Sequence, residues 1–275
     1  MVQQLSSLRG SSAEALQVLG EQVDGDRYTL EEFAALADDL FRAAALLRSE
    51  PSLRRAVTDV STPAEAKASL VRALLDGKLG QPAVDLLAQA VGMRWVAARD
   101  LADTLEHLGV VAAVRSAGRR ESVRLADELF LVAQVVEENA DLRIALSDPV
   151  RSGEDKRQLL RRLLADRALP ATVTLVEQAL AGSFRSFHAA ITEYQKVAAA
   201  TQGEGVALVR VARELDEAER TRLEQALSTQ YGRPVHLNIE VDPALLGGMR
   251  VEIGDDVIDG TVASRLDDAR RRLAG

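Results

Sequence analysis

The sequence predicts a mainly α protein, in which a tandem duplicated helical-bundle N-terminal domain is followed by a small α+β C-terminal domain. Three observations lead to this prediction. Hydrophobic residues make up 47% of the 275 residues but aromatic residues only 3%, and a core of leucine, alanine and valine favours packed helices. Between about residues 11 and 201, apolar residues recur at intervals of three and four, as on one face of a helix. After residue 201 the pattern changes to short alternating runs typical of strands.

The bulk composition limits the classes of function. The formal net charge is −8 and the isoelectric point is near 5.1, which argues against nucleic acid or an anionic membrane surface as the main partner. The chain contains no cysteine, so it has no disulfide framework, thiol nucleophile or thiolate metal site. No apolar run approaches about 18 residues, and the N-terminal residues lack the charged-then-apolar pattern of a signal peptide. We therefore expect no direct membrane insertion, and any membrane association must go through a partner.

An apolar stripe and a set of breaks define the helices of residues 11–201. One helix carries the apolar stripe Leu30, Phe33, Ala34, Ala37, Leu40, Phe41, Ala44 and Leu47. Breaks between helices are expected at Asp24-Gly25-Asp26, Glu50-Pro51, Ser61-Thr62-Pro63, Gly80-Gln81-Pro82, Ser147-Asp148-Pro149 and Leu169-Pro170. Ser61 or Thr62 is predicted to cap a helix with Pro63 at its first position, and Ser152 is predicted to cap a later helix.

The helical region contains an internal repeat with a period of 89 residues. Many leucine and alanine positions match after this shift, which two unrelated helical segments with the same binary pattern would also show. Residues outside the apolar stripes match as well, since Asp59 falls on Asp148 and Lys67 falls on Lys156. These matches favour duplication over a shared pattern.

The repeat sets the domain boundaries that we expect. The first helical-bundle copy covers residues 1–112 and the second covers residues 93–201, so the helix of residues 93–112 belongs to both copies. Residues 206–275 form the small α+β domain, which is too short to be very stable alone.

The α+β domain is predicted from its alternating runs and its capping residues. Gln202-Gly203-Glu204-Gly205 is a linker, and residues 206–211 are predicted to form a strand. A helix then follows, with Asp216 as its cap and Gly232 as its stop. Residues 235–241 alternate as a half-buried strand does.

The last thirty residues contain the most specific sequence motif of the chain. Their pattern predicts a strand, a tight turn, a second short strand and a closing helix. The signature residues are Gly247, Gly248, Gly254, Asp255, Asp259, Gly260, Arg265 and Leu266. This signature resembles the C-terminal signature of the delta subunit of F-type ATP synthases, the oligomycin-sensitivity-conferring subunit family. Thr261 stands where serine is usual in the family, which keeps the hydroxyl group.

The resemblance implies a function without chemistry. A usual delta subunit has one helical domain, so this chain resembles an actinobacterial-like long form with that domain duplicated. The family role is that of a non-catalytic stator subunit in the peripheral stalk. It links the N-terminal helices of the alpha subunits in the catalytic head to the b subunit, and it resists rotor torque during ATP synthesis. The implied location is peripheral, at the cytoplasmic face of the bacterial cell membrane, as part of the complex.

No pattern in the chain indicates a catalytic, cofactor or metal site. Asp255, Asp256 and Asp259 lack the spacing of a calcium loop, so a turn is the simpler interpretation. The glycines of 203–205 precede a strand instead of following one, unlike a dinucleotide loop, and no nucleotide-binding P-loop occurs. The three histidines are far apart and are expected on helix surfaces or on a strand. We therefore expect no catalytic residue, cofactor, metal or small-molecule substrate.

Two groups of residues are candidates for binding a partner. Trp95, Phe184 and Phe187 are expected to anchor the bundle cores, and a groove lined by them could also accept a partner helix. Arg270, Arg271 and Arg272 lie in the last turn of the final predicted helix. There they either complement the helix dipole or contact an acidic partner surface.

Two other classes of function remain as alternatives. One is a generic helical-repeat adaptor unrelated to ATP synthase, which has no reason to reproduce the C-terminal signature. The other is an enzyme, which would need converging nucleophile, base and oxyanion donors that the sequence does not show.

Overall fold

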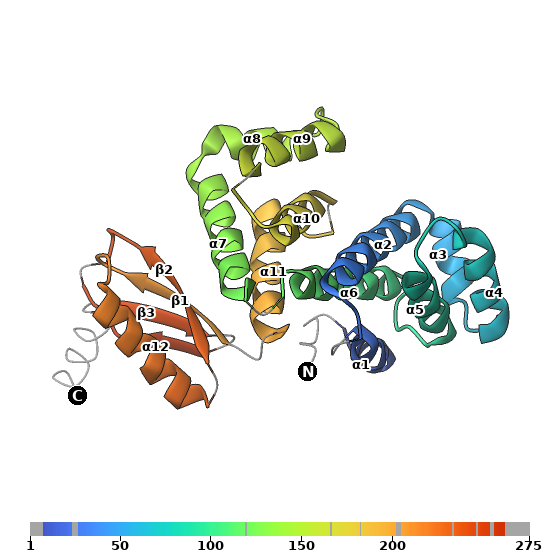
Figure 1. Cartoon of the computed structure of the whole chain (residues 1–275), viewed down its shortest axis with the longest axis horizontal. Helices are drawn as coiled ribbons and strands as arrows, with labels where there is room; N and C mark the ends of the chain where they lie inside the picture. The colour runs from blue at the N-terminus through green and yellow to red at the C-terminus, as the bar shows by residue number, and fades with distance from the viewer. Residues whose placement is uncertain are drawn as a thin grey trace, which may run out of the picture. The chain divides into compact units, whose positions relative to one another are not determined.

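The chain forms two compact units in the computed structural model, Met1–Thr201 and Gln202–Gly275. Helices build the first unit, and the described residues of the second unit form a four-stranded sheet with one helix (Figure 1). The prediction of a mainly α chain with a small α+β C-terminal domain is confirmed. The structure describes residues 8–23, 27–118, 120–165, 167–181, 183–201, 205–232, 234–245, 247–253 and 256–261.

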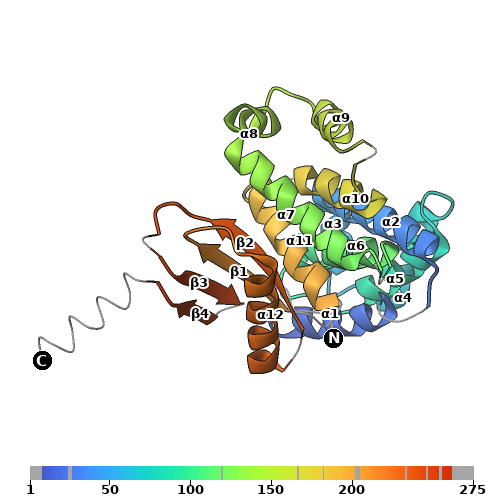
Figure 2. The same cartoon turned by 60° about the vertical axis from the view of Figure 1, so that its left-hand side comes forward.

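The first unit consists of two groups of helices joined by a long one. The first group contains α1 (Ser11–Val23), α2 (Leu30–Ser49), α3 (Pro51–Thr58), α4 (Ala64–Leu75) and α5 (Gln81–Gly92), and the joining helix is α6 (Ala98–Ser116). The second group contains α7 (Ser122–Glu138), α8 (Ala140–Ser147), α9 (Gly153–Leu164), α10 (Pro170–Gln178), the short 3-10 helix η1 (Ala179–Ala181) and α11 (Phe187–Thr201). The helix α2 packs along α6, and α7 packs along α11 in the same way (Figure 2).

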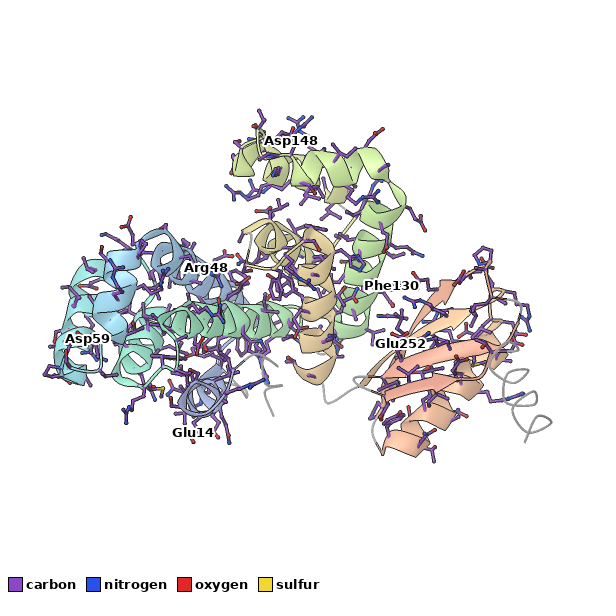
Figure 3. The ribbon with its side chains drawn as sticks, turned by 180° about the vertical axis from the view of Figure 1, so that it is seen from behind. Glu14, Arg48, Asp59, Phe130, Asp148 and Glu252 are labelled. Atoms are coloured by element: carbon purple, nitrogen blue, oxygen red, sulfur yellow. The ribbon has the colours of Figure 1, made fainter. Side chains whose placement is uncertain are left out.

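The 89-residue period of the sequence is also the period of the helices. Adding 89 to the bounds of α3 and α4 gives the bounds of α8 and α9. The turns that follow α3 and α8 match too, at Asp59 and Asp148, which are labelled in Figure 3. Asp59 Oδ1 accepts a hydrogen bond from the backbone N–H of Ser61 at 2.9 Å, and Asp148 Oδ1 accepts one from the N–H of Val150 at 2.8 Å. The repeat therefore extends from the apolar stripes to the turn chemistry.

The two copies differ where α4 and α9 begin. Ser152 caps α9 as predicted, because its hydroxyl accepts the backbone N–H of Asp155 at 3.1 Å. The cap predicted at Ser61 or Thr62 is wrong: Pro63 occupies the N-cap position of α4 and offers no side-chain acceptor. The hydroxyl of Ser61 donates instead to Asp59, at 2.8 Å. The proline was expected one residue further inside the helix.

The helix α6 lies against both groups. It contacts α1, α2, α3 and α5 of the first group and α10 and α11 of the second group. It begins at Ala98, later than the start at residue 93 that the sequence predicts. Residues before it are held in a connection, where Asp100 Oδ2 accepts the N–H of Ala97 at 3.1 Å and the hydroxyl of Ser12 at 2.7 Å. The end of this connection is thereby fixed to α1.

The second unit is a β-α-β crossover extended by a hairpin. Its elements are β1 (Gly205–Val211), α12 (Glu217–Tyr231), β2 (Val235–Val241), β3 (Met249–Ile253) and β4 (Asp256–Asp259). The strand order is β2-β1-β3-β4, in which β1 and β2 are parallel and the other pairs are antiparallel. The predicted caps of α12 are confirmed: Asp216 accepts the N–H of Glu219 at 2.8 Å, and Gly232 ends the helix with φ of 66°. The buried side chains between α12 and the sheet form a separate small core.

Candidate functional site

The aromatic candidates lie in or against the helical core. Trp95 is only 8% exposed, and its indole N–H donates to the backbone oxygen of Ala90 at 2.9 Å. Phe184 and Phe187 are half-buried and pack against the same core. The ring of Phe184 meets Tyr194 edge to face, with 5.8 Å between the ring centres. Partner binding by these residues stays a prediction.

The C-terminal signature residues that the structure describes form one tight backbone joint. Gly248 has φ of 82°, and a side chain there would place its Cβ 2.4 Å from the backbone oxygen of Gly260. The N–H of Gly260 donates to the oxygen of Met249 at 2.9 Å. Asp259 Oδ1 accepts the N–H of Thr261 at 3.0 Å and its hydroxyl at 2.7 Å. Glycine is therefore needed where the chain leaving β4 crosses the chain entering β3.

Gly247 precedes Gly248 in this joint, with φ of 147°. The other predicted residues of the C-terminal region lie outside the described residues. These are Gly254, Asp255, Arg265, Leu266, Arg270, Arg271 and Arg272.

Neither a metal cluster nor a membrane span occurs in the part of the chain that the structure describes. No group of three or more histidine, aspartate or glutamate side chains is placed to hold a metal ion there. None of the described helices is long and apolar enough to cross a bilayer.

The most concentrated polar site of the helical unit is built around Glu106, in the middle of α6. This side chain is only 4% exposed. Its Oε2 accepts from Arg48 on α2 at 2.5 Å, and its Oε1 accepts from Gln178 on α10 at 3.0 Å. Oε1 also accepts the hydroxyls of Ser183 at 2.6 Å and Tyr194 at 2.8 Å. One carboxylate of the joining helix therefore binds both groups of helices.

The electrostatics of this cluster follow from burial and pairing. Burial of Arg48 opposes its charge, but Glu106 and Asp103 outweigh that effect and raise its pKa. Burial and the neighbouring Glu106 together raise the pKa of Tyr194 well above its usual range, so its hydroxyl stays a donor. Burial lowers the pKa of His107 to about 4, so this histidine is neutral at pH 7. Arg48 and Glu106 are thus a charged pair held by neutral donors.

Sequence reasoning did not find Glu106, because a glutamate in a helix is normally a surface residue. Its counterpart in the first copy, Gln17, is exposed. One signal was present in the sequence. Around Glu106 apolar residues occupy every side of the helix, as the buried Ala102, Leu105, Leu108 and Val110 show. A helix that is apolar all round is buried, so its charged residue needs a partner.

The cluster is a connection between the two groups of helices. Both carboxylate oxygens of Glu106 accept hydrogen bonds, from Arg48 on one side and from Gln178, Ser183 and Tyr194 on the other. Removing one partner of a buried ion pair is costly, at about 3–5 kcal/mol. The cluster therefore resists separation of the two groups of helices.

Comparisons with known proteins agree over both units. A family model described as the ATP synthase delta (OSCP) subunit matches residues 111–273. A protein named ATP synthase subunit delta from a Nocardioides species is 92% identical over 275 residues, which covers 100% of both chains. A protein of the same name from Streptomyces coelicolor is 41% identical and covers 98% of this chain and 100% of its own length.

One solved structure aligns with part of the chain. It is a chain of the Toxoplasma gondii mitochondrial ATP synthase hexamer, with 18% identity and a TM-score of 0.38. The alignment covers 60% of this chain and 96% of that chain.

Proposed function

This chain belongs to the ATP synthase delta (OSCP) subunit family and is a peripheral-stalk component of an F-type ATP synthase, and we propose that it acts there as a non-catalytic tie. In this proposal the helical unit holds the N-terminal helices of the alpha subunits, and the α+β unit holds the b subunit. The chain itself performs no reaction. It is located at the cytoplasmic face of the membrane and is bound there through its partners.

The observation that carries the proposal is the similarity over the whole chain. The Streptomyces coelicolor relative is matched over 100% of its length, so both units of this chain have counterparts in one named subunit. A generic adaptor would not need the backbone joint at Gly248 and Gly260, which reproduces the family signature.

The mechanism of such a tie is resistance to torque. While the rotor turns, the catalytic head must be held still, so that proton flow drives ATP formation and not idle rotation. This task requires large contact areas and slow dissociation. It also requires a stiff connection inside the subunit, and the continuous helix α6 with its Glu106 cluster supports that requirement.

We further propose the domain boundaries given by the repeat. One helical copy covers residues 1–112 and the other covers residues 93–201, with residues 93–112 in common. The agreement of helix bounds after a shift of 89 residues supports this division. If each copy offers a groove, the chain binds two alpha N-terminal helices.

Titration calorimetry of the intact chain tests the function. The ligand is a synthetic peptide with the N-terminal sequence of the alpha subunit from the same organism, and a scrambled peptide is the control. We expect saturable binding at two peptides per chain. One peptide per chain would contradict the doubled groove but retain the tie, whereas a folded chain without binding would contradict the proposed attachment to the alpha subunits.

A second experiment tests the non-catalytic role. Thermal-shift measurements with ATP, ADP and Mg²⁺ should leave the melting temperature unchanged, because a ligand that binds the folded state raises it. A concentration-dependent rise with any of these ligands would contradict the proposal.

A further inference from the structure

A cavity of about 120 Å³ lies in the seam between α6 and α11. One wall is the α6 face that carries Asp103 and His107, and the facing wall is the α11 face that carries Glu193 and Tyr194. Phe184, from the segment before α11, closes one side. The mechanical role derived above uses the Glu106 side of this seam and leaves the cavity unassigned.

His107 has unmet hydrogen-bonding capacity at this cavity. The residue is only 5% exposed, and its buried Nε2 has no hydrogen-bond partner in the part of the chain that the structure describes. Nearly all buried polar groups in folded proteins are paired. Because burial keeps this imidazole neutral at pH 7, its Nε2 accepts a hydrogen bond when the proton is on Nδ1. The ring that carries this unpaired acceptor is part of the cavity lining.

The charges around the cavity leave one negative charge unneutralised. Three carboxylates line it, those of Asp103, Glu106 and Glu193. Among the residues that the structure describes, two cations pair with them: Arg48 lies 2.9 Å from Asp103 and 2.5 Å from Glu106, and Lys196 lies 3.3 Å from Glu193. Three negative charges less two positive charges leave an excess of one.

The cavity also has an aromatic wall. The rings of Phe184 and Tyr194 pack edge to face beside the carboxylates. Aromatic faces and carboxylates together attract organic cations, and a guanidinium or ammonium group satisfies both. A single such group also neutralises the remaining charge.

The size of the cavity restricts the ligand further. Sites for cofactors and drug-sized ligands are about 300–1,000 Å³, so the space between α6 and α11 is too small for a nucleotide. It matches the head group of one side chain. We propose that this cavity binds the guanidinium or ammonium group of an arginine or lysine presented by a partner polypeptide.

The site is a feature of the second helical copy alone. A shift of 89 residues places Glu14, Val18 and Thr104 of the first copy at the positions of Asp103, His107 and Glu193. The counterpart of Glu106 is Gln17, so the counterpart seam between α1 and α6 lacks the histidine and two of the three carboxylates. The proposal therefore predicts one cation site per chain.

Titration of the intact chain with methylguanidinium tests the chemistry. The chain has three histidines, and the variants His188→Gln and His236→Gln assign the imidazole NMR signal of His107. We expect a saturable shift of that signal with methylguanidinium and none with methylurea, which has a similar shape but no charge. No shift, or an equal shift with methylurea, would overturn the proposal.

Two conservative variants locate the site. Asp103→Asn and Glu193→Gln should each weaken methylguanidinium binding about tenfold, because each removes one charge from the cavity wall. The control Glu138→Gln, at the exposed end of α7, should bind as the unchanged chain does. Equal binding by all three variants would place the cation elsewhere and refute the assignment.

A labelling experiment tests the source of the cation. Because the chain has no cysteine, Ser183→Cys introduces one thiol at the rim of the cavity without removing a carboxylate, and Glu138→Cys is the matched control. In the assembled synthase, maleimide labelling of the rim thiol should be at least about fivefold slower than in the isolated chain. Unchanged rates would exclude a partner side chain in the cavity. The failure of these tests would not affect the titration with the alpha peptide, which concerns a different contact.

Discussion

Glu106 is the residue that accepts hydrogen bonds from both groups of helices. We expect Glu106→Ala to lower the free energy of unfolding by about 3–5 kcal/mol, because the half-buried Arg48 and the buried hydroxyl of Tyr194 both lose this acceptor. Urea denaturation measures the change. The control Glu138→Ala concerns an exposed glutamate and should stay within about 0.5 kcal/mol of the unchanged chain. Similar values for the two variants would show that the cluster does not hold the helices together.

His107 makes the stability of the helical unit depend on pH. Burial lowers its pKa from the ordinary 6.5 to about 4 in the folded chain, so the unfolded chain binds the proton more readily. The contribution is fully present above pH 6.5 and is lost as the pH falls to about 4. At about 1.4 kcal/mol per pKa unit, the loss is about 3 kcal/mol. Denaturation of the chain and of His107→Leu between pH 7 and pH 4 measures it as a difference in slope, and parallel profiles would contradict it.

Gly248 and Gly232 both have positive φ but differ in their surroundings. A Cβ on Gly248 would lie 2.4 Å from the backbone oxygen of Gly260, whereas a Cβ on Gly232 would have no neighbour within 4 Å. We expect Gly248→Ala to destabilise the second unit by about 3 kcal/mol and Gly232→Ala by about 1 kcal/mol. Denaturation followed by the amide NMR signals of β1 and β3 separates the two effects. Equal losses of stability in the two variants would mean that the positive φ alone, and not the contact with Gly260, determines the destabilisation.

At this scale the sequence predicts the residues whose role is local. Asp216, Gly232 and Ser152 act through neighbours within a few residues, so their spacing alone reveals them. Glu106 and His107 act through partners on distant helices. A single sequence does not show which helix packs on which, and it therefore did not reveal their burial.

Among the elements, α9 shows how a cap stabilises a helix that has few buried side chains. Its only buried residue is Leu160, so the hydrogen bond from Asp155 to Ser152 is a large part of its local stability. We expect Ser152→Ala to cost about 1 kcal/mol, seen as roughly fivefold faster amide hydrogen exchange within α9. The control Ser147→Ala, at the exposed end of α8, should leave that exchange unchanged. No change in α9 for either variant would contradict the role of the cap.

The helices were predictable as elements because prolines, caps and apolar stripes mark them. The start of α6 was not, because the five residues before it look helical in composition. They are held out of a helix by long-range bonds, including the one from the N–H of Val96 to the hydroxyl of Ser12 at 2.8 Å. Prediction of helix bounds from the sequence thus fails where tertiary contacts override the local helix preference.

At the scale of the whole subunit, the close contact between α2 and α6 should determine how well torque is resisted. A Cβ on Gly109 would lie 2.6 Å from the ring of Phe41, so Gly109→Ala must displace this ring or the helix that carries it. We expect synthase containing this variant to lose more ATP-driven proton pumping than ATP hydrolysis, by at least about twofold. The control is Gly92→Ala, whose Cβ would meet Ala64 at an ordinary 3.5 Å. An equal loss of both activities would contradict a mechanical role.

Because α6 belongs to both helical copies, a deletion that removes one copy must match the 89-residue period of the repeat. Excision of 89 residues between corresponding points of α1 and α6 would join the front of one helix to the back of the other in the correct rotational phase. An excision shorter or longer by two residues would rotate the following apolar stripe by about 200° and turn it from the core toward water. Removal of one complete helical copy is therefore a change of length that keeps the following apolar stripe turned toward the core.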